Sequence, residues 1–387
     1  EHCCNRRHRG TRGPTDGGGA GMSLFGDPQA LLSALVRVPS PSGQEGPLAD
    51  QLELWAQSAG LGCERIGHSL VIRVGSRRPG EPRLLLNTHH DTVPVGAGWH
   101  GDPLDGTWRD GRLCARGAND AKASVAAMLA AAYSLRNEEL RGELIVSINA
   151  QEETCNAGMA EVLDHIGRPD AAVTGEPTGL EVVRAQSGLA VLEAHWGGSS
   201  CHAAHVARAD YDSALAKAAK AVAALPGHLE FEGEHELLGR STIAPTIFTS
   251  GVRHNVIPDE AKLVLDARIA PPIDADACLA LVQAYLPDAR ITLRSDRLGP
   301  VETAADHPLV QAALVSAGNS KAIGSNTLSD MALLPGIPAI KCGPGQTIRS
   351  HTPNEFVLLD ELLAGVRFYS TLVPRALLAL TTEKTTP

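Results

Sequence analysis

Short apolar runs alternate along the chain with longer stretches in which apolar residues recur at helical spacing. The run at 144–150 has the length of a buried strand, and the Ala-rich stretch at 121–135 has the length and composition of a helix. Further strand-like runs occur near 69–74, 83–87, 171–174 and 338–342, and further helical stretches near 157–166 and 359–371. Strands that alternate with helices predict an α/β domain.

Between about residues 186 and 299 the order of the predicted elements changes. It becomes strand, helix, strand, strand, helix, strand, at about 190–196, 211–224, 243–249, 262–269, 275–285 and 290–294. This ferredoxin-like order predicts a small α+β domain with one antiparallel sheet. We therefore predict that residues 186–299 are inserted into a discontinuous α/β domain made of residues 22–185 and 300–387. Residues 1–21 show no periodicity, and we expect a disordered extension or a cloning remnant there.

Two signals predict where the first helices begin. Asp27 followed by Pro28 combines an N-cap with proline at the first helical position. Ser42 and Glu45 have the spacing of a capping box, which predicts that Ser42 caps the second helix.

Composition narrows the class of protein. The 387 residues are 43% hydrophobic and 20% charged, with a net charge of −10, as in an ordinary globular protein. An acidic chain is unsuited to nucleic acid or to an anionic membrane surface, and no apolar run approaches the length of about 20 residues that spans a bilayer. Eight scattered cysteines without a CxxC pair favour reduced thiols. We expect a cytoplasmic enzyme that binds neither nucleic acid nor membrane.

The strand-like run near 83–87 leads directly into His89 and Asp91, and Pro94 then ends any strand. Ligands of open α/β sheets collect at the carboxyl ends of strands. An imidazole is a good zinc ligand, and a nearby carboxylate can hold its other ring nitrogen. We interpret His89 as a metal ligand and Asp91 as its positioning partner, although a lone His-X-Asp is more often an ordinary loop.

Other ligand-type residues follow the later predicted strands. Glu152 and Glu153 come after the run at 144–150, Glu176 comes after 171–174, and His351 follows the strand near 338–342. Asp120 stands at the start of the 121–135 helix, where it could also serve simply as an N-cap. Two histidines with several carboxylates suit zinc, cobalt or manganese better than calcium.

A charge argument favours two metal ions over one. Two zinc ions bring four positive charges, which three carboxylates and a hydroxide balance. We predict that Asp120 bridges the ions, that His89 and Glu176 bind one of them, and that Glu153 and His351 bind the other. Glu152 is then free to act as the general base that activates water, which is the arrangement used in metal-assisted hydrolysis.

Five motifs together resemble those of the acetylornithine deacetylase and succinyl-diaminopimelate desuccinylase family, in the same order and over roughly residues 22–375. They are His89-His-Asp91-Thr-Val-Pro, Gly117-Ala-Asn-Asp120-Ala-Lys, Glu152-Glu153, Gly175-Glu176-Pro-Thr and Ser350-His351-Thr-X-X-Glu-Phe. The resemblance implies a zinc-exopeptidase-like catalytic domain, two zinc ions replaceable by cobalt or manganese, and hydrolysis of an N-acylated amino acid. It also implies a homodimer formed through the inserted domain, which acts as a lid.

The resemblance assigns roles to three residues of the inserted domain. His202 matches a lid histidine that reaches the neighbouring subunit's site and helps to stabilise the oxyanion. Asn255 and Arg268 match contacts to the substrate carboxylate, although a salt bridge from Arg268 to Asp266 would explain that arginine equally well. The loop departs from the family pattern, because Cys201 precedes His202 where glycine is usual.

The substrate is less constrained than the chemistry. Residues 324–330 and 341–345 look most like acetylornithine deacetylases, with Thr327 and Ser329 as candidate hydrogen-bond donors to substrate, unless they only form turns. A succinyl group would require an additional cation near the metals, and we identify none in the sequence. The first choice is therefore N-acetylornithine. Alternatives are an N-succinyl or N-acetylcitrulline deacylase, a hydrolase of carrier-linked amino acids, a dipeptidase or carboxypeptidase, and a metal-stabilised binding protein without activity.

Overall fold

Strands that are buried on both faces form the centre of the larger domain. The structure is a computed structural model that describes residues 23–76 and 78–385, so the expectation for residues 1–21 lies outside the described residues. A nine-stranded sheet has the order β1-β2-β6-β3-β7-β16-β8-β14, with β15 paired to β8. Its strands are β1 (Cys63–Ile66), β2 (Ser69–Gly75), β3 (Arg83–His89), β6 (Glu143–Asn149), β7 (Ala171–Thr174), β8 (Val183–Gln186), β14 (Val301–Glu302), β15 (Ile323–Ser325) and β16 (Ala339–Lys341).

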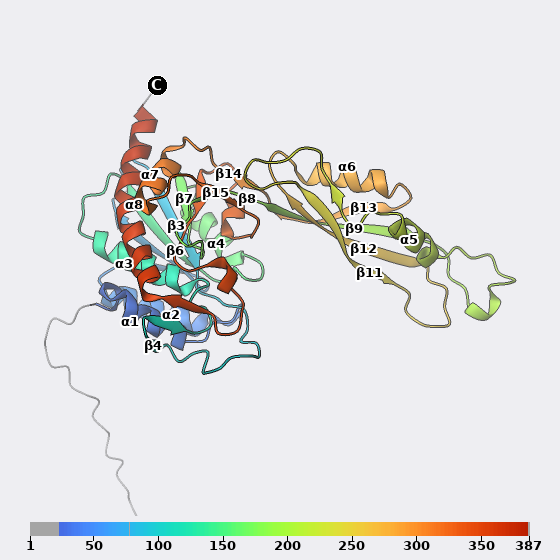
Figure 1. Cartoon of the computed structure of the whole chain (residues 1–387), viewed down its shortest axis with the longest axis horizontal. Helices are drawn as coiled ribbons and strands as arrows, with labels where there is room; N and C mark the ends of the chain where they lie inside the picture. The colour runs from blue at the N-terminus through green and yellow to red at the C-terminus, as the bar shows by residue number, and fades with distance from the viewer. Residues whose placement is uncertain (1–22, 77, 386–387) are drawn as a thin grey trace, which may run out of the picture.

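Helices cover both faces of this sheet (Figure 1). Along β3, Leu84 and Leu86 pack into the core beside α3 and α8, whereas Leu85 faces the opposite cluster with Met159 of α4. A strand buried on both sides therefore reads as a continuous apolar run. The helices are α1 (Pro28–Arg37), α2 (Gly46–Ser58), α3 (Lys122–Leu135), α4 (Ala157–Ile166), α7 (Pro308–Ala317) and α8 (Leu359–Thr385), with a three-stranded sheet of β4 (Trp108–Arg109), β5 (Arg112–Cys114) and β17 (Phe356–Leu358) at one end.

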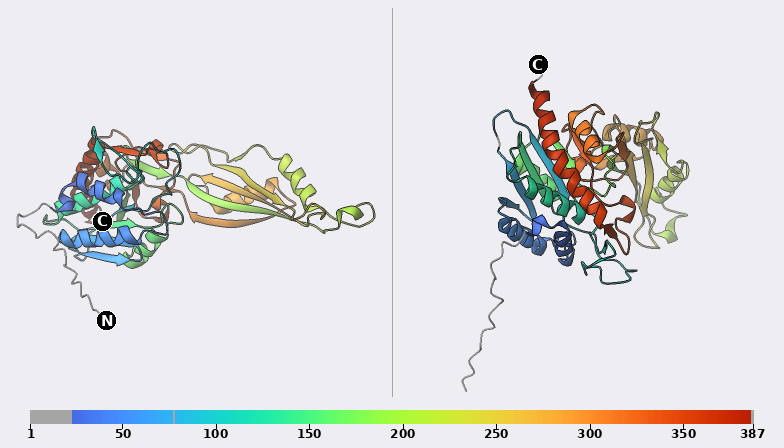
Figure 2. Two further views of the ribbon diagram at one scale, coloured as in Figure 1. Left: turned by 90° about the horizontal axis from the view of Figure 1, so that it is seen from below. Right: turned by 60° about the vertical axis from the view of Figure 1, so that its left-hand side comes forward.

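A separate five-stranded sheet forms the small domain, which projects from the larger one in Figures 1 and 2. Residues along β9 are alternately buried and half-buried, because α5 and α6 cover one face of the sheet only. The order β10-β11-β12-β9-β13 and the two helices confirm the predicted ferredoxin-like arrangement. The elements are β9 (Gly188–Gly197), α5 (Ala214–Ala223), β10 (Leu229–Glu230), β11 (Thr242–Ser250), β12 (Glu260–Ile269), α6 (Ala275–Tyr285) and β13 (Arg290–Leu298).

The predicted capping box is wrong. Glu45 is the N-cap residue of α2, and no side chain hydrogen-bonds the helix end. The Ser42 hydroxyl donates instead to Asp91 Oδ2 at 2.6 Å, and Glu45 Oε1 accepts from the Gly43 and Gln151 amides. Both side chains thus hold together loops that lie far apart in the sequence.

Helix α8 is longer than predicted and runs to Thr385. Its segment at 359–382 is long and apolar enough to cross a membrane by length and composition, although the sequence analysis did not single it out. One side of α8 is buried against α3 and α7, with Phe368, Tyr369 and Leu372 in the core. The apolar character of α8 is therefore explained by packing within this domain.

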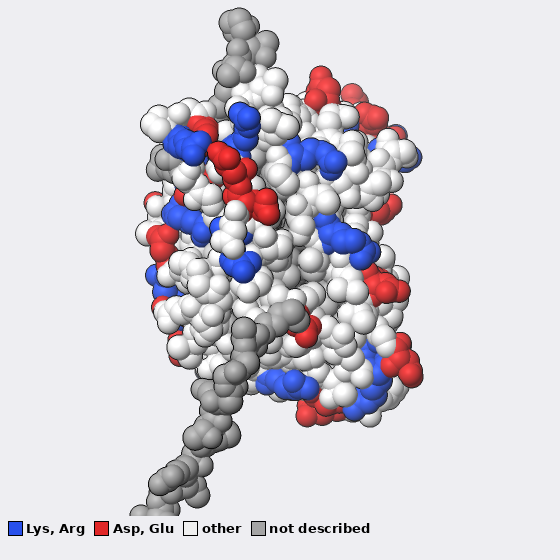
Figure 3. Space-filling view, turned by 90° about the vertical axis from the view of Figure 1, so that its left-hand side faces the viewer, with Lys and Arg blue, Asp and Glu red and all other residues white. Residues whose placement is uncertain are grey.

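Lys, Arg, Asp and Glu are interspersed on the face of the larger domain that Figure 3 shows. No extensive field of one sign is visible on that face.

Candidate metal centre

Neighbouring parallel strands bring the predicted ligands to one edge of the large sheet. Strands β6, β3, β7 and β16 lie side by side in parallel, and carboxyl ends of parallel strands meet at the same edge. His89 is the last residue of β3, and Glu152 and Glu153 follow β6. Glu176 follows β7. This geometry explains how residues far apart in the sequence come to surround one point.

Asp91 orients His89 and the turn that carries the two glutamates. The Nδ1 atom of His89 lies 3.0 Å from the Asp91 carbonyl and 3.5 Å from Asp91 Oδ1. The two carboxylate oxygens of Asp91 accept the Glu152 and Glu153 amides at 3.0 and 3.2 Å. Burial would raise the pKa of Asp91, but hydrogen bonding, first of all to His89, lowers it to about 2. Asp91 is thus a fixed anion that leaves Nε2 of His89 free for a metal.

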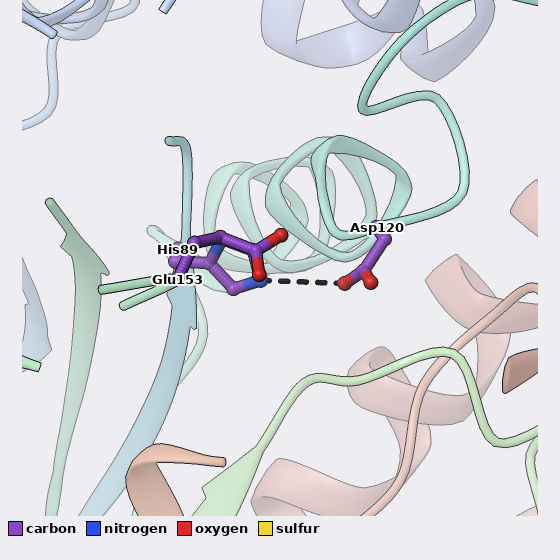
Figure 4. A group of neighbouring side chains, drawn as sticks. All are labelled: His89, Asp120 and Glu153. Carbon is purple, nitrogen blue, oxygen red and sulfur yellow. Dashed lines mark ion pairs between the residues drawn. The ribbon is translucent and has the colours of Figure 1, made fainter. Parts of the chain in front are cut away.

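Asp120 lies between the two histidines, and Figure 4 shows its carboxylate facing His89. Its Oδ1 is 3.4 Å from His89 Nε2, and its Oδ2 is 3.4 Å from His351 Nε2. Glu153 Oε2 lies 2.9 Å from His351 Nε2. Ligand atoms of His89, Asp120 and Glu153 all lie within 4.8 Å of one another. A carboxylate with one oxygen directed at each imidazole has the geometry expected of a bridge between two cations.

The surroundings of the Glu176 carboxylate indicate that cations fit this site. Its Oε1 is buried without a hydrogen-bond partner among the described residues, 3.9 Å from His89 Nε2. Burial raises the pKa of Glu176 to about 8, with His89 opposing the shift and Asp120 adding to it. Buried carboxylates are normally paired or bound to metal, and cations would lower this pKa again. The imidazole and carboxylate donors therefore fit divalent metals such as zinc, cobalt or manganese.

Glu152 belongs to the same cavity but is not held by either histidine. Burial raises its pKa well above the ordinary value. Asn156 Nδ2 lies 3.5 Å from Glu152 Oε1 and 3.0 Å from the buried Asp330 Oδ1. From the small domain, Arg297 Nη1 donates to the Cys155 carbonyl and to Asn156 Oδ1. The turn that presents Glu152 is therefore supported from both domains.

Glu355 was quoted in the sequence motif but received no role there. Its buried carboxylate pairs with Arg116 at 2.7 Å. It also accepts the backbone amides of Gly117, Asn119 and Asp120 at 3.1, 2.8 and 2.9 Å. These bonds fix the loop on which Asp120 stands. Only its place four residues after His351 hinted at this function.

We expect Glu355→Ala to destabilise the protein and to weaken metal binding. The change leaves Arg116 buried without its partner, which costs about 3–5 kcal/mol of unfolding free energy. Loss of such a supporting contact typically lowers metal affinity about 10–100-fold. Thermal unfolding and a metal titration measure both effects. Glu64→Ala, which removes a half-exposed partner of Arg73, is the control and should cost less than about 1 kcal/mol; equal effects of the two changes would contradict this role of Glu355.

The cavity around these carboxylates has a volume of about 270 Å³. Its lining residues are Asp120, Glu152, Glu153, Glu176, Pro177, Thr178, Thr327, Leu328, Lys341, Thr347, Ser350 and His351. Thr327 is thus placed where it could meet a substrate. Ser329 is buried, donates to Gln186 Oε1 at 2.6 Å and does not line the cavity, so its predicted substrate contact gains no support. Lys341 is a cation at the site, which the sequence analysis had failed to identify.

The three predicted residues of the small domain do not line this cavity. His202 is exposed, and its Nε2 is 3.5 Å from Asn255 Nδ2. The two loops that carry His202 and Asn255, between β9 and α5 and between β11 and β12, lie at the end of the small domain farthest from the large sheet (Figure 1). Arg268 pairs with Asp266 at 2.7 Å, as in the simpler interpretation of that arginine. Their proposed roles would therefore require a neighbouring subunit or a movement of the small domain, and they stay predictions.

Fold and site together define a metal-dependent hydrolase built on a mixed α/β domain with a separate antiparallel-sheet domain. The chain belongs to peptidase family M20/M25/M40, whose model matches residues 85–375. A site for two metal ions is typical of this family, and the resemblance stated from the motifs is confirmed.

Proteins that are similar in sequence or in structure support the assignment to this family. Acetylornithine deacetylase of Myxococcus xanthus is 29% identical over 87% of this chain and 93% of its own length. Succinyl-diaminopimelate desuccinylase of Cereibacter sphaeroides is 34% identical over 62% of this chain and 67% of its own. The YXEP protein of Bacillus subtilis, described as a dinuclear metal binding peptidase from the M20 family, aligns with a TM-score of 0.70 at 17% identity, covering 92% of this chain and 98% of that one.

Proposed function

We propose that this protein removes the acyl group from an N-acylated amino acid by hydrolysis, with N-acetylornithine as the first candidate substrate. The observation that carries the proposal is the position of Asp120 between His89 and His351, with the half-buried Glu152 beside them and held by neither. A structural metal site needs ligands, but it has no use for an additional carboxylate that faces the cavity without binding an ion. We therefore set aside an inactive binding protein.

Two zinc ions, with cobalt or manganese as substitutes, would lower the pKa of water and polarise the amide carbonyl. Asp120 would hold both ions. His89 and Glu176 would hold one, and Glu153 and His351 the other. Glu152 then takes a proton from the attacking water and returns it to the leaving amine nitrogen, so that the amide C–N bond breaks to give a carboxylic acid and a free amino group.

The small domain completes the proposed catalytic unit. We propose a homodimer formed through its sheet, in which His202 stabilises the oxyanion in the neighbouring subunit's site and Arg268 and Asn255 contact the α-carboxylate of the substrate. The exposed position of His202 at the end of the small domain supports a contact outside its own chain. We also propose a cytoplasmic location, which the free state of Cys63, Cys114, Cys155, Cys201, Cys278 and Cys342 supports.

The choice of acetyl rests on similarity and not on geometry. The Myxococcus xanthus relative, which covers most of this chain, is described as an acetylornithine deacetylase. The desuccinylase relative makes N-succinyl amino acids the second candidate. N-Acetylcitrulline, carrier-linked amino acids and dipeptides follow as further alternatives within the same chemistry.

A substrate screen tests the proposal. Protein reloaded with zinc should release amino acid from N-acetylornithine, and chelation should lower turnover by at least about 100-fold because water then loses its activation. N-succinyl amino acids and dipeptides form the comparison set, and zinc added back after chelation is the control for irreversible damage. The proposal fails if reloaded protein hydrolyses none of these amides, or if chelated protein stays fully active.

A further inference from the structure

Lys341 places a buried positive charge at the metal cavity. It is the last residue of β16 and pairs with Thr174 of β7, two residues before the ligand-type Glu176. The residue is only 2% exposed, yet it lines the cavity together with Thr327 and Glu176. Lys341 thus stands at the same strand edge as the carboxylates, one strand further along the sheet.

The ammonium group of Lys341 has only neutral partners. Its Nζ lies 3.0 Å from Ser325 Oγ, 2.9 Å from the Thr327 carbonyl and 3.0 Å from Thr327 Oγ1. Within the described part of the chain, no carboxylate forms an ion pair with it. Buried cations are normally paired, as Arg83 is with Glu143 at 3.1 Å.

A second buried lysine shows what a purely structural role looks like. Lys122 Nζ donates to the Leu35 and Val38 carbonyls at the end of α1, both at 3.1 Å, and does not line the metal cavity. Its charge complements the carboxyl end of a helix. Lys341 has no helix end to complement, because all three of its partners belong to residues 325–327.

Metal binding would remove the remaining compensation for this charge. Glu176, Glu152 and Asp120 are close enough to act on Lys341 through space. Two divalent ions would neutralise the four carboxylates of that cluster, Asp120, Glu152, Glu153 and Glu176, so the ammonium would be left without a net negative charge beside it. An anionic group arriving with the substrate would supply the missing counter-charge. The hydroxyls of Ser325 and Thr327, 2.9 Å apart, could rotate to donate to the same anion.

We propose that Lys341 is a specificity-determining residue whose ammonium binds a carboxylate of the N-acylated substrate. The inference rests on the proposed deacylase function. Two carboxylates have this chemistry: one at the far end of a dicarboxylic acyl group such as succinyl, and the α-carboxylate of the amino acid. Binding of the acyl carboxylate would make N-succinyl amino acids better substrates than their N-acetyl counterparts. Binding of the α-carboxylate would make N-acylated amino acids with a free α-carboxylate better substrates than the corresponding α-carboxamides.

Kinetics with matched substrates test this inference on the zinc-loaded protein. The four substrates are the N-acetyl and N-succinyl derivatives of one amino acid, each prepared with a free α-carboxylate and as the α-carboxamide. Lys341→Met removes the charge and keeps the length. We expect it to lower kcat/KM about 10–100-fold for substrates with the recognised carboxylate, mostly through KM, and less than about threefold for those without it. The pair of substrates that shows the difference identifies which carboxylate is bound.

Further variants separate charge from loop support. Lys341→Arg keeps the charge and should retain most of the discrimination. Thr327→Val removes a hydroxyl partner of Lys341 but not the charge, and should lower kcat/KM for the substrates with the recognised carboxylate by a smaller factor than Lys341→Met does. Lys341→Gln serves in place of Lys341→Met if the latter does not fold, because it keeps a donor to the loop without the charge.

Two results would overturn the assignment. A loss that is uniform over the four substrates in Lys341→Met would make the residue a support for the loop at 325–327. Unchanged kinetics would remove it from the site. A wild-type protein that hydrolyses none of the four would instead contradict the proposed function, so the two failures are distinguishable.

Discussion

Glu152→Gln should keep its metal ions and lose about 10²–10⁴-fold in kcat, the usual contribution of a general base. The amide has the size of the carboxylate but cannot accept a proton. The Asp91 carboxylate would still hold the backbone amide of residue 152, so the turn and the neighbouring Glu153 should stay in place. Metal analysis and steady-state kinetics on the best substrate of the screen give the two readouts.

The control for this change is Glu161→Gln on the outer side of α4, an exposed glutamate that should have no effect on kcat. If Glu152→Gln turned over at the wild-type rate, the residue would have no part in proton transfer. If it lost metal instead, Glu152 would be a ligand and the division of roles between Glu152 and Glu153 would have to be exchanged.

Asp120→Asn should weaken the binding of both metal ions, by at least about 100-fold, because a neutral amide would replace the one carboxylate that faces both histidines. Equilibrium dialysis followed by metal analysis measures the number of ions retained. Activity should fall in parallel with metal content.

A matched control is Asp50→Asn, whose side chain is 70% exposed and pairs with Arg65 at the surface. Retention of one tightly bound ion in Asp120→Asn would show that Asp120 serves a single ion and is no bridge. Retention of two ions with unchanged affinity would remove it from the centre.

The fold and the main site residues could be predicted because short stretches of the sequence indicate both the strands and the ligand-type residues that follow them. Buried parallel strands are continuous apolar runs in the sequence, and ligand-type residues stand at or just after their ends, as His89 does at the end of β3 and Glu176 does two residues after β7. Carboxyl ends of neighbouring strands meet, so the sequence order alone suggests convergence. The structure brings His89, Asp120 and Glu153 together as expected.

The supporting residues could not be predicted, because their partners are distant in the sequence. Glu355 contacts amides more than 230 positions earlier in the chain, and Asp330 accepts from Asn149 and Asn156 at separations of 181 and 174. Lys341 lies in a strand that looks wholly structural until its pairing with β7 is known. Ser42 and Glu45 have the spacing of a capping box, but the Ser42 hydroxyl donates to the distant Asp91 carboxylate and does not cap the helix.

The contact between Arg297 and the turn at Cys155 and Asn156 has a mechanical consequence. Arg297 belongs to β13, and the chain returns to the large sheet at β14, four positions after Arg297. The turn that Arg297 contacts presents Glu152. A hinge motion of the small domain must either break the hydrogen bonds from Arg297 or move the turn at Cys155 and Asn156 together with the domain. Closure of the small domain over a substrate would then be coupled to the position of Glu152, and so to proton transfer.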